Sequence, residues 1–520
     1  MTISKAYSAI PFGFSGRQIT VEGDLSRGLP AFNIVGMANK TVSEARERVR
    51  SALRSSQLSF PDQKVTINLA PADLLKDGAF LDLPIALSIL VLSKQLPQSS
   101  LLDRLFIGEL SLDGSLRPVR GIINIVEKAK KQGYNEIFLP YDNLPQASLI
   151  TGVKLYGVKT LQQLFLHLQH QQPISPYVNV VRKTETDTDG PILDHIVGQS
   201  IVKRALTIAI AGHHNILISG PPGSGKTMLA KAAANLLPNL SNSECIDVTK
   251  LYSLAGLSDQ IITTRPFRNP HHTSSLISLI GGGVKATPGE ISLAHHGVLF
   301  LDELPEFPRN VIEALRQPLE DHFITLARLN HTTTYPASFI LVATMNPCPC
   351  GYLGDPTHKC TCTSTQIQHY QNKLSGPLLD RIDIIVNAQR VAHTDLLKNS
   401  IQSSFTPNEQ VFKTTSISSS EHNVVKNNIT AAIQRQRTRY QRSNLYNGTL
   451  PSSQITSQLT LTPAAKKLLL TASEKLQLSA RSYFKVIKVA QTIADFANSD
   501  IIKPEHLSEA LTYRGNFATI

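Results

Sequence analysis

A strand, loop and helix pattern at residues 215–227 constrains the fold of this chain more than any other feature. The segment NILISGPPGSGKT places an apolar run directly before Gly220-x-x-x-x-Gly225-Lys226-Thr227. Glycines allow backbone N–H groups to surround phosphate oxygens, and the helix that follows points its N-terminus at them. We therefore expect Lys226 to neutralise the β- and γ-phosphates of a nucleotide and Thr227 to help hold Mg²⁺. The predicted ATP-binding residues are Gly220, Pro221, Pro222, Gly223, Ser224, Gly225, Lys226 and Thr227.

Two further apolar runs end in polar side chains. GVLFLDE ends in Asp302 and Glu303, and SFILVATMN ends in Asn346. Parallel sheets bind ligands at the carboxyl ends of their strands, so we expect Asp302 to hold Mg²⁺ together with Thr227. Glu303 would then polarise the attacking water, and Asn346 would orient the same water. The alternatives are a strand that simply leaves the core at Asp302 and a turn at Asn346.

Two arginines are candidates for contact with a γ-phosphate. Arg381 lies in GPLLDRIDI, and Arg481 lies in LSARSYFKVIKVAQTIADF. Either could form an ordinary salt bridge. Arginines that reach a γ-phosphate stabilise the charge that spreads over the transferring group, and a neighbouring subunit often supplies them.

The order of apolar and polar stretches predicts an α/β multidomain protein. Residues 1–170 alternate short strands with helices, and residues 171–190 are rich in Pro, Gln, Thr and Asp, which is typical of a linker. Residues 191–395 alternate strands and helices again. Residues 396–455 are a polar connecting segment, and residues 456–520 are predicted to be helical.

Charge and hydropathy limit the partners and the location. The formal net charge of +12 favours an anionic partner such as nucleic acid, although a general surface excess of lysine and arginine is an equal alternative. The longest apolar stretch, residues 83–92, is too short to span a bilayer. The first 16 residues do not have the pattern of a signal peptide. We expect a cytoplasmic protein with no membrane partner.

Four of the five cysteines lie in the loop NPCPCGYLGDPTHKCTC, residues 346–362. Their spacing, C-x-C-x₉-C-x-C, can supply four thiolates to a tetrahedral Zn²⁺, and His358 could replace one of them. Two disulfides, which a reducing cytoplasm disfavours, and four free thiols are the alternatives. We expect one structural Zn²⁺ per chain. The candidate zinc ligands are Cys348, Cys350, Cys360 and Cys362.

Several segments together resemble a known family. DHIVGQSIVKRAL, RPFRNPHH, GVLFLDELPEF, ATMNPCPCGY and LLDRIDI are similar to motifs of the Mg-chelatase-like AAA+ ATPases of the YifB/ComM type, and the resemblance covers about residues 5–510. It implies an AAA+ P-loop α/β core with a parallel sheet and a C-terminal helical lid. In this family Asn346 corresponds to the first sensor, Arg381 to an arginine finger supplied in trans, and Arg481 to the second sensor. A finger supplied in trans requires a closed homo-oligomer, which by resemblance is a hexamer.

The resemblance also implies insertions that could contact DNA. Hairpins in related ring helicases project into the central pore, and FITLARLNHTTTYPASF is similar to such a hairpin. Arg328, Asn330 and His331 near its tip are candidates for binding DNA, with a solvated loop as the alternative. Arg265 and Arg268 in RPFRNPHH form a second, weaker candidate.

The N-terminal region resembles the proteolytic domain of Lon. NLAPADLLKDGAFLDLPIALSIL and LSLDGSLRPVRGIINIVEKAKKQGYNEIFLP carry this resemblance. Lon requires a serine nucleophile and a lysine base, and the matching positions here are Phe80 and Ile123. A phenyl ring cannot attack a carbonyl and an isoleucine cannot accept a proton, so we expect this domain to be proteolytically inactive. The roles that remain for this domain are assembly of the ring and contact with DNA or with a protein partner.

The resemblance implies an ATP- and Mg²⁺-dependent hexameric DNA motor, a helicase that drives branch migration in homologous recombination. Its partners would be branched DNA and recombination proteins, and it would promote the integration of transforming DNA in natural competence. A chelatase- or Lon-type ATPase that remodels a protein partner is the alternative. A third, weaker alternative is a regulatory ATP-binding protein without mechanical output. Such a protein would not need the hydrolytic residues Glu303 and Arg381, and both are present.

Overall fold

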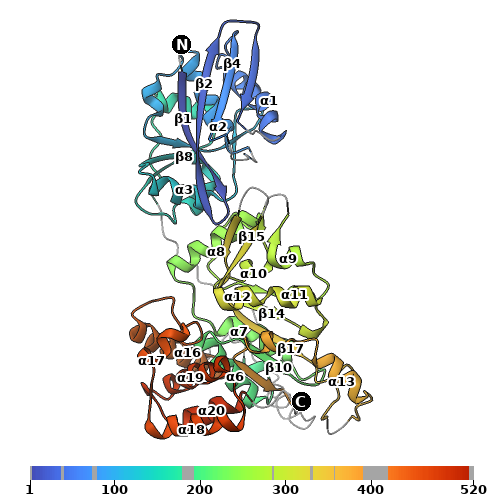
Figure 1. Cartoon of the computed structure of the whole chain (residues 1–520). Helices are drawn as coiled ribbons and strands as arrows, with labels where there is room; N and C mark the ends of the chain where they lie inside the picture. Colours follow the sequence, from blue (N-terminus) through green and yellow to red (C-terminus); the bar gives the residue numbers. More distant parts are fainter. Residues whose placement is uncertain are drawn as a thin grey trace, which may run out of the picture. The chain divides into compact units, whose positions relative to one another are not determined.

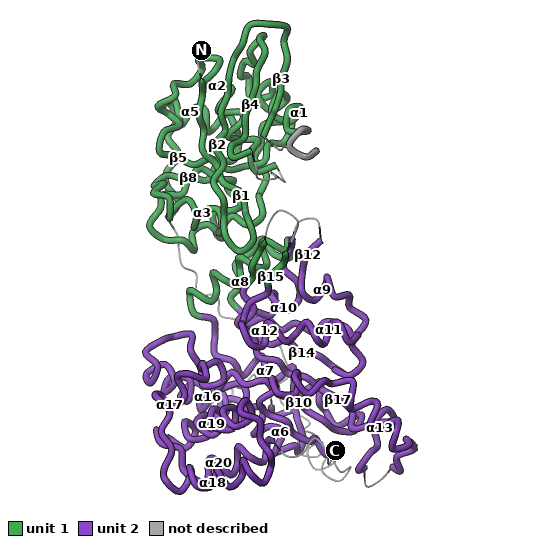
Figure 2. Tube along the Cα trace, in the orientation of Figure 1, with its two compact units in different colours: residues 1–185, 241–263, 325–335 green, residues 186–240, 264–324, 336–520 purple. Residues whose placement is uncertain are grey.

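The structure is a computed structural model that divides into two compact units (Figure 2). It describes residues 3–36, 40–72, 76, 79–178, 193–283, 286–327, 332–355, 358–390 and 420–514. Unit 1 comprises residues 1–185, 241–263 and 325–335, and unit 2 comprises residues 186–240, 264–324 and 336–520. Two segments that the sequence analysis assigns to the ATPase core, 241–263 and 325–335, therefore belong to unit 1.

Unit 1 is built on a seven-stranded mixed sheet with the strand order β3-β4-β2-β1-β5-β8-β9 (Figure 1). The β1–β2 and β2–β4 pairs are antiparallel, and the other pairs are parallel. The strands are β1 (Ile3–Phe12), β2 (Ser15–Ser26), β3 (Ala31–Val35), β4 (Lys64–Ala70), β5 (Arg104–Phe106), β8 (Glu136–Pro140) and β9 (Lys154–Val158). A small antiparallel pair, β6 (Glu109–Leu110) and β7 (Leu116–Arg117), lies outside this sheet.

Helices complete the N-terminal core. They are α1 (Lys40–Ser55), α2 (Asp82–Leu92), α3 (Ile122–Lys131), α4 (Leu144–Ala147) and α5 (Leu161–Leu168). Every residue of α2 is buried, including Asp82 at its first position. The Asp82 carboxylate accepts hydrogen bonds from Arg48 at 2.7 and 3.0 Å, which satisfies a charge that burial would otherwise penalise. Burial still dominates and raises the pKa of Asp82 to about 6.

The two positions that match the Lon catalytic pair lie in one apolar environment. Phe80 packs against the hydrophobic cluster that contains the fully buried Ile123. These side chains fill space and offer neither a nucleophile nor a base. The absence of proteolytic activity stays a prediction.

Helix α8 (Asn242–Ala255) packs within unit 1. Its N-terminus has a capping box made by Ser241 and Glu244. Lys250, which is 4% exposed, forms an ion pair with Glu127 on α3 at 2.8 Å. Ser253 accepts a hydrogen bond from the N–H of Gly121 at 2.9 Å. These buried polar contacts explain why α8 groups with the N-terminal residues.

Unit 2 contains a five-stranded parallel sheet with the strand order β11-β14-β17-β10-β18. This confirms the predicted parallel α/β core. The strands are β10 (Ile216–Ser219), β11 (Phe267–Arg268), β14 (Val298–Leu301), β17 (Ile340–Met345) and β18 (Ile384–Asn387). All residues of β10, β14 and β17 are buried, which is expected for parallel strands covered on both faces. The strand order reverses at β10, and ligands bind such sheets at the carboxyl edge of that point.

Short and long helices surround this sheet (Figure 1). They are α6 (Ser200–Gly212), α7 (Lys226–Leu236), α9 (Leu276–Ile280), α10 (Glu290–Leu293), α11 (Arg309–Ala314), α12 (Arg316–Asp321), α13 (Ser364–Gln371) and α14 (Gly376–Leu379). Short strands β12 (Gly281–Gly282) and β13 (Thr287–Pro288) pair with each other. Strands β15 (Phe323–Ala327) and β16 (Thr332–Pro336) form a separate two-stranded sheet, as the hairpin pattern predicts.

The C-terminal region is helical with one small pair of parallel strands. Its helices are α16 (Glu421–Tyr440), α17 (Ser452–Gln458), α18 (Pro463–Lys475), α19 (Ala480–Phe496) and α20 (Pro504–Thr512), and its strands are β19 (Thr460–Leu461) and β20 (Ile501–Ile502). The apolar faces of these helices share one core with the parallel sheet, since Ile493 and Ile218 belong to the same cluster. Within the described ranges, no helix is long and apolar enough to cross a membrane.

Candidate nucleotide-binding site

The predicted ATP-binding segment, residues 220–227, is called the phosphate loop below. It connects β10 to α7 and has the backbone conformation that its glycines permit. Gly223 and Gly225 have φ values of 76° and 82°. A side chain at Gly220 would place its Cβ 2.5 Å from the carbonyl oxygen of Ala388. The Ser224 hydroxyl donates a hydrogen bond to the carbonyl of Pro221 at 2.8 Å and closes the loop. A larger residue at any of these glycines would strain or displace the loop.

Lys226 is buried at the first position of α7. Its ammonium group donates to the carbonyls of Gly220 at 2.6 Å and Pro221 at 3.0 Å, and to Oδ1 of Asn346 at 3.2 Å. Burial lowers the pKa of Lys226, while the nearby charges of Asp302 and Glu303 oppose this effect. The three N–H groups of the lysine are therefore all directed at oxygens of the loop region, and phosphate oxygens of a bound nucleotide would replace one or more of these acceptors.

Asp302 lies directly after β14 and faces α7. The hydroxyl of Thr227 donates to Oδ2 of Asp302 at 3.2 Å. A threonine hydroxyl and a carboxylate are oxygen ligands, which Mg²⁺ prefers, and Mg²⁺ takes its remaining ligands from water and phosphates. The donor set fits the metal that the sequence predicts at this position.

Thr344, a residue that the sequence analysis did not select, connects the two acidic residues. Its hydroxyl donates to Oδ1 of Asp302 and accepts a hydrogen bond from the N–H of Glu303 at 3.0 Å. Glu303 has a left-handed backbone conformation with φ of 52°. No local sequence pattern selects Thr344, because only the pairing of Leu301 with Ala343 in the folded sheet makes the next residues, Asp302 and Thr344, neighbours.

Gln199 is a second residue that the sequence analysis missed. It lies at the N-terminus of α6 with φ of 57°, and its side-chain amide donates to the carbonyl of Ser224 at 3.1 Å. The same amide group donates to the carbonyl of Gln389, which follows β18. Gln199 thus fixes the phosphate loop against the end of β18. Its only sequence signal is its position directly before a helix.

The structure brings Lys226, Thr227, Asp302 and Asn346 together and Glu303 beside them, but it places Arg381 and Arg481 elsewhere. These two arginines meet at Glu320 and line a cavity of about 360 Å³ with Lys485 and Lys488. The described lining of this cavity includes no residue of the phosphate loop. The arginine pair therefore forms a second site within unit 2.

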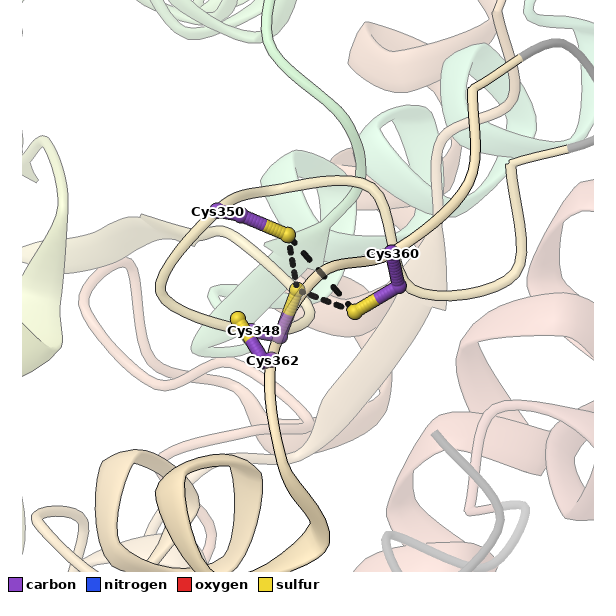
Figure 3. A group of neighbouring side chains, drawn as sticks. All are labelled: Cys348, Cys350, Cys360 and Cys362. Atoms are coloured by element: carbon purple, nitrogen blue, oxygen red, sulfur yellow. Dashed lines mark hydrogen bonds between the residues drawn. The ribbon is translucent and has the colours of Figure 1, made fainter.

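The four predicted zinc ligands converge (Figure 3). The sulfurs of Cys348, Cys350 and Cys360 lie 3.4 to 3.7 Å apart, and all four ligand atoms lie within 4.8 Å of one another. Four sulfurs at about 2.3 Å from a tetrahedral Zn²⁺ would be about 3.8 Å apart. None of the five cysteines, all of them in the described residues, forms a disulfide. His358 instead contacts Arg390 at 2.9 Å, so the four thiols form the group without it.

The cysteine loop lies against the phosphate loop. A Cβ at Gly351, which has φ of 84°, would be 2.7 Å from Cδ of Pro222. The side-chain amide of Gln371 on α13 donates to the carbonyl of Pro347 at 3.3 Å. Because Asn346 precedes this loop directly, the conformation of the loop also determines where Asn346 points.

The structure describes only some of the candidate DNA-binding residues. Arg328, Asn330 and His331 lie outside the described residues. Arg265 donates to the carbonyls of Pro238 at 2.6 Å and of His296 at 2.7 Å. Arg268 forms a bidentate pair with Glu290, with both distances 2.6 Å. Arg265 and Arg268 thus have partners within the protein, and their contact with DNA stays a prediction.

We expect Lys226→Ala to reduce ATP hydrolysis by at least about 100-fold, because the phosphates lose their principal cation. Phosphate release at saturating ATP measures this effect. Lys231→Ala, on the exposed face of the same helix, is the matched control and should hydrolyse ATP normally. Normal turnover by Lys226→Ala would show that the phosphate loop is misassigned.

We expect Thr344→Val to bind ATP but to hydrolyse it about tenfold more slowly, because both acidic residues lose a hydrogen-bond partner while the side-chain volume is kept. Nucleotide binding and single-turnover hydrolysis measure the two effects separately. Thr207→Val is the control, since that buried hydroxyl only donates to the carbonyl of Lys203 in its own helix. Equal hydrolysis by wild type and Thr344→Val would contradict the assigned role.

Comparison with known proteins finds three family models and a partial relative that match separate parts of the chain. The family described as magnesium chelatase, subunit ChlI, matches residues 192–396, the family of subunit ChlI of Mg-chelatase matches residues 21–143, and the ChlI C-terminal family matches residues 419–514. Lon protease 2 of Bacillus subtilis is 30% identical over 120 residues, which are 23% of this chain and 21% of that protein.

Two relatives match almost the whole chain. Competence protein ComM of Haemophilus influenzae is 40% identical over 522 residues, which cover 99% of this chain and 98% of that protein. The uncharacterized protein YifB of Escherichia coli K12 is 40% identical over 520 residues, which cover 99% of this chain and 97% of that protein. The chain therefore belongs to the YifB/ComM family of magnesium-chelatase-like AAA+ ATPases.

Proposed function

We propose that this protein is an ATP-dependent hexameric DNA motor that drives branch migration during homologous recombination. The observation that carries the ATPase part is the convergence of Lys226, Thr227 and Asp302 at the carboxyl edge of a parallel sheet. Family membership agrees with ATP and Mg²⁺ as ligands. The DNA part rests on the net charge of +12, on the β15–β16 hairpin and on the competence-related name of the Haemophilus influenzae relative.

The site residues have separable roles in hydrolysis. Lys226 neutralises charge on the β- and γ-phosphates, and the loop N–H groups bind the same oxygens. Asp302 and Thr227 would hold Mg²⁺, which supplies positive charge to the phosphates when bound. The Glu303 carboxylate accepts a proton from the attacking water, and Asn346 orients that water. Thr344 holds Asp302 and Glu303 in the required positions.

The separation of the two sites supports a ring. Arg381 and Arg481 share one cavity, and its described lining includes no residue of the phosphate loop. An arginine supplied by a neighbouring subunit would complete each nucleotide site. Such a head-to-tail contact closes into a ring, and we propose six subunits by family resemblance.

The proposed biological role is the integration of transforming DNA in natural competence. Branched DNA is the proposed substrate, recombination proteins are the proposed partners, and the cytoplasm is the proposed location. The alternative is an ATPase that remodels a protein. The similarity to magnesium-chelatase and Lon sequences favours this alternative specifically. Salt-sensitive binding to forked DNA would distinguish the DNA motor, since a protein remodeller need not show it.

We expect the wild-type protein to migrate a synthetic Holliday junction or three-strand junction with ATP, and Glu303→Gln to bind ATP without migration. The amide cannot accept the proton of the attacking water. Gel separation of the labelled junction and its products measures migration. Glu313→Gln, which removes a surface ion pair with Arg316, is the control and should migrate junctions normally. ATP hydrolysis by an assembled ring without junction migration would favour protein remodelling.

We also propose that the four cysteines bind one structural Zn²⁺ per chain. The sulfur distances fit a closed tetrahedral site, and such a site has no open position for substrate. Its proposed role is to fix the loop that lies on Pro222 and follows Asn346.

Metal analysis of the purified protein should find about one zinc per chain, and Cys348→Ser with Cys350→Ser should lose it. Cys245→Ser is the matched control, because Cys245 donates to the carbonyl of Ile262 and is not part of the cluster. Because the loop supports Asn346, loss of zinc should also slow ATP hydrolysis. A metal-free protein with full activity would exclude the proposal.

A further inference from the structure

One carboxylate, Glu320, binds both arginines of the second site. Glu320 lies near the end of α12, Arg381 follows α14, and Arg481 is in the first turn of α19. Arg481 donates to Oε1 of Glu320 at 3.0 Å, and Arg381 donates to Oε2. Three elements far apart in the sequence thus meet at one side chain. Two of them belong to the core, and α19 belongs to the C-terminal helices.

The two lysines of this cavity already have partners. Lys485 pairs with Asp383 at 2.7 Å, and Lys488 donates to the carbonyl of Gly448 at 3.2 Å. Burial would raise the pKa of Asp383, but Lys485 is the principal opposing charge, and the pKa falls to about 2. Asp383 is therefore committed to Lys485. Glu320 is the carboxylate that balances the arginine pair.

The two arginine side chains differ in their exposure and in the hydrogen bonds that their N–H groups form. Arg381 is 14% exposed, and it also donates to the carbonyl of Pro377 at 2.7 Å. Its Nε is buried and lacks a hydrogen-bond partner among the described residues. Arg481 is 53% exposed, with Glu320 as its ion-pair partner. Two guanidinium groups at such close range repel each other unless an anion lies between them, so the position of Arg481 depends on Glu320.

We propose that Glu320 is a positioning residue for ATP hydrolysis, which holds Arg381 and Arg481 side by side so that both reach the terminal phosphate of a nucleotide on the neighbouring subunit. This inference rests on the proposed ring ATPase. Glu320 thereby connects α12 in the core to α19 of the C-terminal helices. Glu320 itself does not touch the reacting atoms.

Substitution of Glu320 tests this role. A glutamine has one acceptor oxygen for two guanidinium groups, and its amide N–H groups would face one of them. We expect Glu320→Gln to lower kcat for ATP about tenfold while KM changes less than about twofold, because the misplaced arginines act mainly in the transition state. Glu320→Asp keeps both acceptor oxygens and should recover part of the loss. Glu421→Gln is the control. Glu421 is similarly exposed, and among the described residues its ion-pair partner is Lys203, at 2.7 Å.

A mixing experiment tests action on the neighbour. Lys226→Ala subunits cannot hydrolyse ATP but retain the arginine pair and Glu320. Mixed with Glu320→Gln subunits, they should restore hydrolysis above the sum of the two variants alone, because an intact pair then faces an intact phosphate loop. Size-exclusion chromatography checks that each variant assembles. If Glu320→Gln does not assemble, the same mixing experiment is done with Glu320→Asp.

An unchanged or raised kcat for Glu320→Gln, or no recovery on mixing, would overturn the assignment of Glu320. Failure of the proposed ATPase activity itself gives a different result, because the wild-type protein would then lack ATP hydrolysis. None of these measurements depends on DNA as the substrate.

Discussion

The parallel pairing of β14, β17 and β10 is the constraint on which the nucleotide site depends. Ser219 pairs with Met345, and Leu301 pairs with Ala343. Because the strands end at the same edge, the residues that follow them meet there. A shift of one residue in either register would turn the polar ends toward the opposite face and separate the lysine, the carboxylates and the amide. The site is therefore a consequence of strand register in a fully buried sheet.

Charged groups around this sheet are held by specific partners. A buried charge is strongly unfavourable unless ion pairs and hydrogen bonds compensate it. Lys226 is bound by carbonyls and Asn346, Asp383 by Lys485, and the arginine pair by Glu320. These contacts join the core to the C-terminal helices.

Apolar packing fills the place in the N-terminal unit where the sequence predicts a lost catalytic pair. Phe80 packs against the hydrophobic cluster that contains the buried Ile123. The same unit binds α8 through Lys250 and Ser253, although α8 is inserted between the strands of the ATPase sheet in sequence. A segment that lies between strands of the parallel sheet in sequence is therefore part of the N-terminal unit.

The sequence by itself determined the local chemistry. It identified the phosphate loop, the acidic residues after β14, Asn346 and the cysteine cluster, because each depends on short spacing or on a strand that ends in polar residues. It also predicted the α/β class and the family. Only the tertiary structure showed that Thr344 joins Asp302 to Glu303, that Gln199 binds the phosphate loop, and that Arg265 and Arg268 have internal partners. The meeting of Arg381 and Arg481 at Glu320 was likewise decided by the packing of distant helices, since no local pattern relates residues 161 positions apart.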